Sequence, residues 1–270
     1  MAWRQRCRPA LDMEILGLWP AWIWLALLGA MIFAAVAHGA VGFGFPLLST
    51  PLVALLTDVQ TAVLLTLVPN VVINVISITR GADWRQTLRT HWPVAAWVLV
   101  GTLLGTQVLT RASPAALKLL LAALIVFYLL QSRAGPAAAH PLLHRYPRSS
   151  AGLFGLLGGF FSGTVNVAVP PLLIYFTSLE LAPLVMTQAM NLSFLSGRLT
   201  QVLAMISTGH MGLGWILLGV PLSVIAVAAL SGGFRLQRRF SRATFARLMR
   251  ALLWVMAAIL VGQVVRDYLS

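Results

Sequence analysis

The stretch AHGAVGFGFPLLSTP, residues 37–51, joins two apolar segments of the chain and decides how they are arranged. Three glycines and two prolines between residues 39 and 51 prevent one regular helix from running through it. Gly42 and Gly44 relax the backbone, while Pro46 fixes φ and suits a helix start. A bilayer tolerates such a break only where protein buries it or where it lines a polar cavity. We therefore expect a broken helix at membrane depth, the feature around which solute-binding sites in membranes are built.

The composition of the chain assigns it to a membrane. Of its 270 residues, 59% are hydrophobic and only 9% are charged, and the mean hydropathy is +0.89. A soluble domain has about a quarter of its residues charged. The net charge of +13 comes from arginines in short connections between apolar runs, without interleaved aromatic residues. We therefore expect a lipid bilayer as partner and cytoplasmic arginines, and no nucleic acid.

The sequence gives little support for a metal, a cofactor or an enzyme. Cys7 is the only cysteine, which excludes intrachain disulfides and a cysteine metal centre. His140 and His144 are four residues apart, but Pro141 breaks the helix that would align them. Paired carboxylates, a Ser/His/Asp set, an HExxH motif and a phosphate-binding loop are also missing from the sequence. We therefore expect no cofactor, no metal site and no enzymatic activity.

Apolar runs divide the chain into two halves of five pieces each, and a helix needs about 20 apolar residues to cross the hydrocarbon core. The runs span 15–37, 47–56, 62–78, 93–109 and 115–130, and then 152–161, 172–177, 184–206, 213–230 and 246–265. In each half the first two pieces meet at a Gly/Pro break, and the second break reads SGTVNVAVPP at 162–171. The pattern predicts an all-α integral membrane protein with about eight to ten membrane segments, counting the short broken helices. Two repeats, 15–131 and 151–266, would be joined by a polar linker at 132–150.

The distribution of arginine indicates that the two repeats are inverted. Arginines lie between the third and fourth pieces of the first half and between the fourth and fifth pieces of the second: Arg80, Arg85, Arg89, Arg235, Arg238, Arg239 and Arg242. The equivalent connections carry at most one formal charge, since residues 207–212 have none and the turn after the fourth piece has Arg111. Cytoplasmic loops collect arginine. The two halves are therefore predicted to face opposite ways, a recurrent plan of secondary transporters.

The beginning of the chain leaves two topologies open. Strict inversion puts the N-terminus outside, whereas Arg4, Arg6 and Arg8 favour the cytoplasm. A start at Met13 would remove these arginines, and a complete first crossing would also resolve the conflict. Asp12 interrupts the pattern of a signal peptide, so we interpret the first run as a retained membrane segment.

The two breaks and the helices that follow them resemble the TauE/SafE sulfite exporter family of membrane transporters. The resemblance is carried by GFGFPLLSTP at 42–51, by 58–66, by LVPNVVIN at 67–74, by 155–171 and by QAMNLS at 188–193. It covers nearly the whole chain and implies a multi-pass permease of the plasma membrane, the bacterial inner membrane. The solute that it implies is a small sulfur-containing or related organic anion, such as sulfite or a sulfonate, which the protein would export. At 164–168 the sequence TVNVA lacks the triple glycine that is common in the family.

The candidate substrate site lies between the two breaks. Short helices that start at Pro46 and Pro170 would present free N–H groups and about half a positive charge, which favours an anion. Arg198 is the one charge well inside an apolar run. In the alternative reading, the glycines serve only close packing and the polar side chains only bond neighbouring helices. The predicted substrate-binding residues are Gly42, Gly44, Ser49, Asn70, Asn74, Ser162, Thr164, Asn166, Gln188, Asn191 and Arg198.

Three titratable residues are candidates for coupling transport to protons. Asp58 and Glu180 follow the two short runs, where capping of the next helix is the simpler role. His38 flanks the first break, where a neutral, packed histidine is the simpler role and a proton relay the alternative. Because acidic residues are so few, we expect uniport of an anion by alternating access, driven by the membrane potential. A non-transporting scaffold subunit of a membrane complex is the alternative function, and the sequence makes no prediction of oligomeric state.

Overall fold

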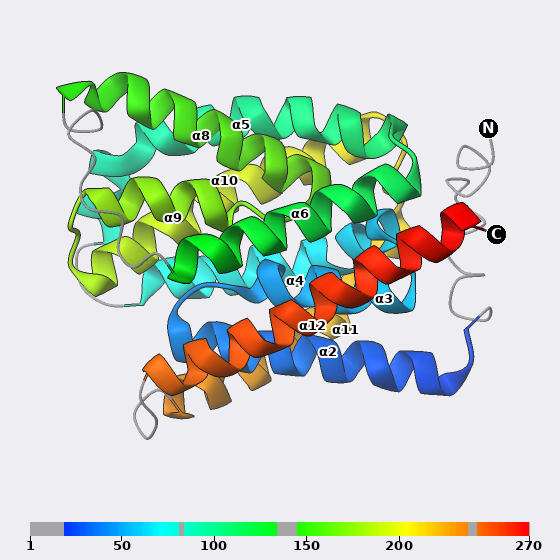
Figure 1. Ribbon diagram of the computed structural model, residues 1–270. Coiled ribbons are helices and arrows are strands. Elements are labelled where there is room, and N and C mark those ends of the chain that lie inside the picture. Colours follow the sequence, from blue (N-terminus) through cyan, green and yellow to red (C-terminus); the bar gives the residue numbers. More distant parts are fainter. Residues whose placement is uncertain (1–18, 81–83, 134–144, 237–241, 270) are drawn as a thin grey trace.

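The computed structural model describes residues 19–80, 84–133, 145–236 and 242–269, which form a bundle of helices (Figure 1). Within these residues the chain has ten helices and no strand, which confirms the all-α fold. The helices are α2 (Ala21–Val41), α3 (Phe45–Leu56), α4 (Val59–Thr79), α5 (Trp84–Arg111), α6 (Pro114–Arg133), α8 (Pro147–Val165), α9 (Val169–Ser178), α10 (Pro183–Ser207), α11 (Leu213–Leu236) and α12 (Arg242–Leu269). We refer to α2–α6 as the first half and to α8–α12 as the second half.

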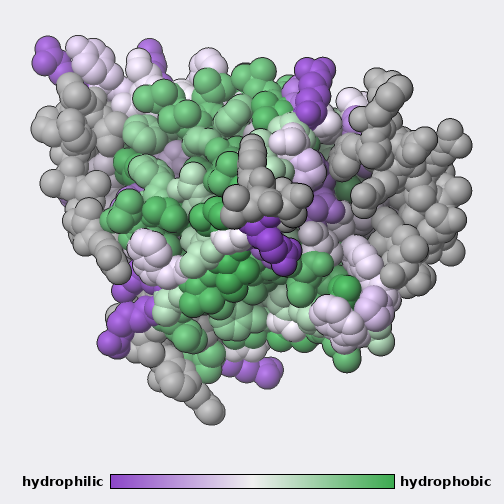
Figure 2. All heavy atoms as spheres, turned by 45° about the vertical axis from the view of Figure 1, so that its right-hand side comes forward, coloured by the Kyte–Doolittle hydropathy of each residue, from purple (hydrophilic) through white to green (hydrophobic). Residues whose placement is uncertain are grey.

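The helices have the lengths and the surface of an integral membrane protein. Six of the described helices are long and apolar enough to cross a bilayer, namely α2, α4, α5, α6, α11 and α12. The apolar helices α3 and α9 are shorter, with 12 and 10 residues. Large hydrophobic side chains face outward, among them Leu25 and Leu203, which are 70% and 69% exposed. Figure 2 shows hydrophobic side chains over much of one face, as expected of a surface that contacts lipid.

Both breaks exist but are shorter than the sequence pattern suggests. α2 continues to Val41 and α8 continues to Val165, so that only residues 42–44 and 166–168 are not helical. Gly42 and Gly44 have φ values of 99° and 121°, which glycine adopts without a steric penalty. Asn166 ends α8 at φ 63°, the left-handed conformation in which asparagine is the most tolerated side chain after glycine.

Several boundaries differ from those of the apolar runs. Arg85 and Arg89, predicted to lie in a loop, belong to α5, which begins at Trp84 and includes Pro93 in its interior. Polar residues at the membrane surface can remain helical, so the apolar run 93–109 corresponds only to the part of α5 that follows its first turns. Similarly, both ends of the predicted linker 132–150 are helical, and residues 134–144 lie outside the described part.

The helices of the two halves pack closely through glycine. A side chain on Gly159 or Gly105 would overlap a backbone carbonyl across the α5–α8 interface. Across the α2–α11 interface, a Cβ on Gly39 would lie 2.5 Å from the carbonyl oxygen of Leu230 and 2.9 Å from the Cα of Gly233. Small residues let membrane helices approach to backbone contact, where dispersion and weak hydrogen bonds stabilise the pair.

One end of the bundle gathers the ends of α4 and α11 and the start of α10. The guanidinium carbon of Arg80 lies 3.4 Å from the centroid of the Phe234 ring. At the same end, Gln188 Nε2 donates to the carbonyl oxygen of Arg80 at 3.1 Å. The start of α2 and the C-terminal end of α12 both lie at the opposite end (Figure 1).

We predict that Gly159→Ala destabilises the protein in detergent by about 1–3 kcal/mol, because the added Cβ would overlap the backbone of Val98 and the two helices must separate. Gly262→Ala is the matched control, since no atom lies within 4 Å of its Cβ position. The control should be neutral or more stable by up to about 1 kcal/mol, because alanine favours helix. Denaturation of the purified variants measures both effects, and equal stabilities would contradict the proposed packing.

Candidate functional site

Each break is held by an asparagine from the long helix of the other half. We call α4 and α10, which pack against each other, the central helices. Asn70 of α4 donates from Nδ2 to Asn166 Oδ1 at 3.2 Å, at the second break. Asn191 of α10 donates from Nδ2 to the carbonyl oxygen of Gly42 at 2.8 Å, at the first break. The two bonds form a crossed pair: Asn191 pairs a backbone carbonyl of the first break, and Asn70 holds the side chain of Asn166 at the second.

The second break carries a buried cluster of hydrogen-bonded polar side chains. Asn166 is completely buried, and its Nδ2 donates to Thr50 Oγ1 at 2.7 Å and to Thr66 Oγ1 at 2.8 Å. Its Oδ1 accepts from Asn70, whose own Oδ1 accepts from Asn74 Nδ2 at 3.2 Å. Buried amides and hydroxyls are tolerated in an apolar environment only when paired in this way. The cluster therefore joins α3, α4 and the end of α8 at one point.

The first break is capped by a histidine. His38 Nδ1 accepts the backbone N–H of Phe45 at 3.2 Å, which is the first N–H of α3. Because Nδ1 is an acceptor, the ring proton lies on Nε2, where it is donated to Ser77 Oγ at 2.9 Å. This geometry fits the neutral, packed role that the sequence made the simpler reading of His38.

Arg198 is the most unusual side chain of the described structure. Its guanidinium is 2% exposed, and every hydrogen bond that it makes there goes to a neutral group. Nη1 donates to Gln201 Oε1 at 2.7 Å, and Nη2 donates to the carbonyl oxygen of Ser162 at 2.9 Å and to its hydroxyl. Gln201 Nε2 in turn donates to the carbonyl oxygen of Gly163 at 2.8 Å. The two side chains thus bind carbonyls in the last turn of α8, which carry a partial negative charge.

Four buried side-chain atoms of the central helices have no hydrogen-bond partner in the described residues: Arg198 Nε, Gln60 Oε1, Asn74 Oδ1 and Asn191 Oδ1. An unpaired buried polar group is costly and rare in native structures. Arg198 Nε is the one donor among these four atoms of the described residues, and the other three are amide oxygens, which accept.

The starts of the short helices offer fewer N–H groups than expected for an anion site. In α3 the N–H of Phe45 is taken by His38, and Pro46 has none. In α9 both Pro170 and Pro171 lack an N–H. The formal positive charge near the breaks therefore comes from Arg198 rather than from the short helices.

The other predicted residues have separate roles. Gln188 lies at the end of α4, where it donates to the carbonyls of Ile78 and Arg80 and accepts from Thr87 Oγ1 at 2.9 Å. The hydroxyls of Ser49 and Thr164 bond carbonyls of their own helices. Helical spacing predicted that Gln188 and Arg198 share one face of α10. It did not show that Gln188 lies at the end of the bundle, bonded to the end of α4, while Arg198 contacts α8.

The two acidic candidates differ from each other. Asp58 is the N-cap of α4, as the simpler reading predicted, and accepts from the N–H of Thr61 at 2.9 Å. The same prediction for Glu180 is wrong, because Ala182 is the N-cap of α10 and Pro183 occupies the first turn. Glu180 instead adopts φ 50° in the turn after α9.

Sequence reasoning missed three residues of these clusters: Thr50, Thr66 and Gln201. Thr66 lies four residues before Asn70, and Gln201 lies three residues after Arg198, so helical spacing could have found both. Thr50 has no such signal, because it reaches Asn166 only through tertiary packing.

We predict that Asn70 and Asn166 are energetically coupled. A double-mutant cycle with Asn70→Ala and Asn166→Gly should give a coupling energy of about 0.5–1.7 kcal/mol, the range of hydrogen bonds between membrane helices. Glycine at 166 keeps the positive φ, so the cycle reports the side-chain bond rather than backbone strain. Unfolding in detergent measures the four stabilities, and additivity within about 0.3 kcal/mol would contradict the coupling.

Comparisons with known proteins agree with this architecture. Neither the curated proteins nor the solved structures provide a match to the chain. A family model described as "Sulfite exporter TauE/SafE" matches residues 27–260, which include both breaks and both central helices. This family consists of multi-pass membrane transporters, in agreement with the six candidate spans, and its members lie in the plasma membrane. The chain belongs to the TauE/SafE sulfite exporter family.

Proposed function

We propose that the protein exports a small oxyanion of the sulfite or sulfonate class, and that Arg198 binds this anion between the two breaks. The observation that carries the proposal is the buried guanidinium with neutral partners and an unpaired Nε in the described residues. A charge inside a membrane protein is expensive and is by default a functional residue.

The chemistry of guanidinium favours an oxyanion. Its N–H groups donate hydrogen bonds to carboxylate-like oxygens, and the ionic charges strengthen these bonds. In Arg198, Nη1 and Nη2 hold Gln201 and Ser162, and Nε is the atom left for a solute. Ser162 is completely buried and sits one turn before the second break, so its hydroxyl would share this anion.

The packing supports two related halves that move against each other. When α2–α6 are matched in order with α8–α12, the contact between α5 and α8 corresponds to the contact between α11 and α2. The contact between α5 and α10 likewise corresponds to the contact between α11 and α4. Hydrogen bonds also have counterparts in the other half. The bond from Asn70 to Asn166 corresponds to that from Asn191 to Gly42. The bond between His38 and Ser77 corresponds to that between Ser162 and Arg198. We infer from this correspondence, and from the charge pattern, an inverted repeat that supports alternating access.

The same arrangement supports an orientation in the membrane. Arg80 and Phe234 meet at one end of the bundle, and the arginine-rich connections after α4 and α11 begin there. The positive-inside rule makes this end cytoplasmic. The start of α2 lies at the other end, on the outer side, as strict inversion requires (Figure 1).

Export needs no proton if the solute is an anion. Of the two acids predicted to couple, Asp58 is engaged as a helix cap and Glu180 lies in the turn before α10. An anion that leaves a cell with a negative interior gains about 2.3 kcal/mol per charge per 100 mV, which corresponds to about a fortyfold concentration ratio. We therefore propose uniport driven by the membrane potential.

Sulfite flux in proteoliposomes tests the role of Arg198. Arg198→Gln should lower the flux at low sulfite concentration by about 10- to 100-fold, because a hydrogen bond to a charged group contributes about 1.5–3 kcal/mol. Arg111→Gln, at the exposed end of α5, is the control and should transport like the wild type. Thermal unfolding of each variant identifies loss of fold. Unchanged flux in folded Arg198→Gln would contradict the site, and absence of flux in the wild type would favour the scaffold alternative.

The driving force has its own test. In vesicles loaded with sulfite, a potassium diffusion potential that is negative inside should accelerate efflux through the protein, because the solute carries negative charge. A pH gradient imposed at clamped zero potential should leave the rate unchanged. Efflux that followed the pH gradient and ignored the potential would contradict uniport and return Asp58, Glu180 and His38 to consideration as coupling residues.

A further inference from the structure

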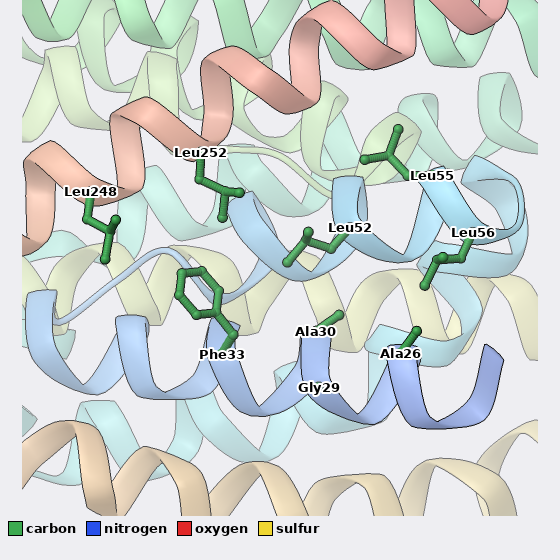
Figure 3. Close-up of a pocket in the computed structure, with 9 residues that line it drawn as sticks. All are labelled: Ala26, Gly29, Ala30, Phe33, Leu52, Leu55, Leu56, Leu248 and Leu252. Carbon is green, nitrogen blue, oxygen red and sulfur yellow. The ribbon is translucent and has the colours of Figure 1, made fainter. Parts of the chain in front are cut away.

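We propose that a groove between α2, α3 and α12 binds an acyl chain of an anionic phospholipid from the cytoplasmic leaflet. The groove has a volume of about 500 Å³ and nine lining residues, all of them apolar. This volume falls within the usual range of small-molecule sites. Figure 3 shows side chains of all three helices pointing into the same space, with Phe33 from α2, Leu52 from α3 and Leu252 from α12.

The floor of the groove is open because of a glycine. Gly29 is exposed on α2, and no atom lies within 4 Å of the position that its Cβ would take. Leu248 at one edge is 56% exposed, so the groove opens on the outer surface of the bundle. Both α2 and α12 contain candidate membrane spans, which places this opening against the hydrocarbon of the bilayer.

The lining determines the kind of occupant. The transported anion finds no hydrogen-bond donor among the side chains of the groove, since every lining residue is apolar. An acyl chain needs only apolar contact and is the material that surrounds these helices in a membrane. The groove therefore suits lipid rather than the solute.

Charge at one end of the groove selects the head group. Arg247 precedes the lining residue Leu248 in the chain and is exposed near the start of α12. The start of α12 follows α11, whose Phe234 contacts Arg80 at the arginine-rich end of the bundle. Anionic lipids of the cytoplasmic leaflet are attracted to a basic residue at this position, and Arg247 would contribute about fivefold in binding.

A lipid in the groove would contact the short helix that follows the first break. Leu52, Leu55 and Leu56 of α3 form one side of the groove. The proposal makes no use of transport and stands whether or not the protein exports sulfite. It predicts that the lipid stabilises the fold, because a ligand that binds only the folded state shifts the unfolding equilibrium.

Native mass spectrometry of the full chain in detergent tests the site, with equal amounts of phosphatidylglycerol and phosphatidylethanolamine added. The wild type should retain one phosphatidylglycerol in about fivefold preference and should unfold at a higher temperature when it is present. Gly29→Phe should lose this retention, because the ring would occupy the groove. Gly262→Phe is the control on α12, where the Cβ position also has no atom within 4 Å, and should keep it.

The head-group assignment is tested separately with Arg247→Gln, which should abolish the preference for phosphatidylglycerol while some lipid is still retained. This variant leaves the groove unchanged, so it remains informative even if Gly29→Phe fails to fold. Equal retention in folded Gly29→Phe and the wild type would overturn the groove as the site. A dimer without lipid in the wild-type spectrum would also overturn it, because a second copy of the chain would then cover this face.

Discussion

A break in a membrane helix frees backbone groups that have no water to bond, so each must be paired inside the protein. The rest of this structure depends on how that constraint is met. At the first break, His38 caps the start of α3 and Asn191 binds the carbonyl of Gly42. At the second, Asn166 ends α8 in a left-handed conformation and is held by Asn70. The first break is therefore paired by both halves, and the second, whose backbone N–H groups at 166 and 167 bond within the second half, is held to the first half through the side chain of Asn166.

This crossed arrangement explains why glycine and polar side chains share one region. Backbone contact at Gly105 and Gly159 brings α5 against α8, and contact at Gly39 brings α2 against α11. The central helices fill the space between these pairs and carry the polar groups that reach the breaks. Arg198 then lies where α10 meets the last turn of α8, a partly negative environment that holds the guanidinium, and its Nε has no partner in the described residues.

Much of this fold was predictable because glycine and proline limit the backbone locally. The pattern around Pro46 and Pro170 predicted short helices at 47–56 and 172–177, and α3 and α9 occupy Phe45–Leu56 and Val169–Ser178. Contacts between halves were not predictable in the same way, since helical spacing identifies a face but not its partner. Helical spacing therefore grouped Gln188 with Arg198 in one site, although Gln188 binds the end of α4. The role of Thr50 arises only when α3 meets the second break.

The central claim is that a small oxyanion binds beside Arg198 between the two breaks. The most direct measurement is a crystal structure of the protein soaked with selenite, a sulfite analogue whose selenium gives an anomalous signal. The account predicts a selenium peak within hydrogen-bond distance of Arg198 Nε, close to Ser162, and its disappearance in crystals of Arg198→Gln. A peak only at the exposed arginines of the cytoplasmic end, with none between the breaks, would contradict it.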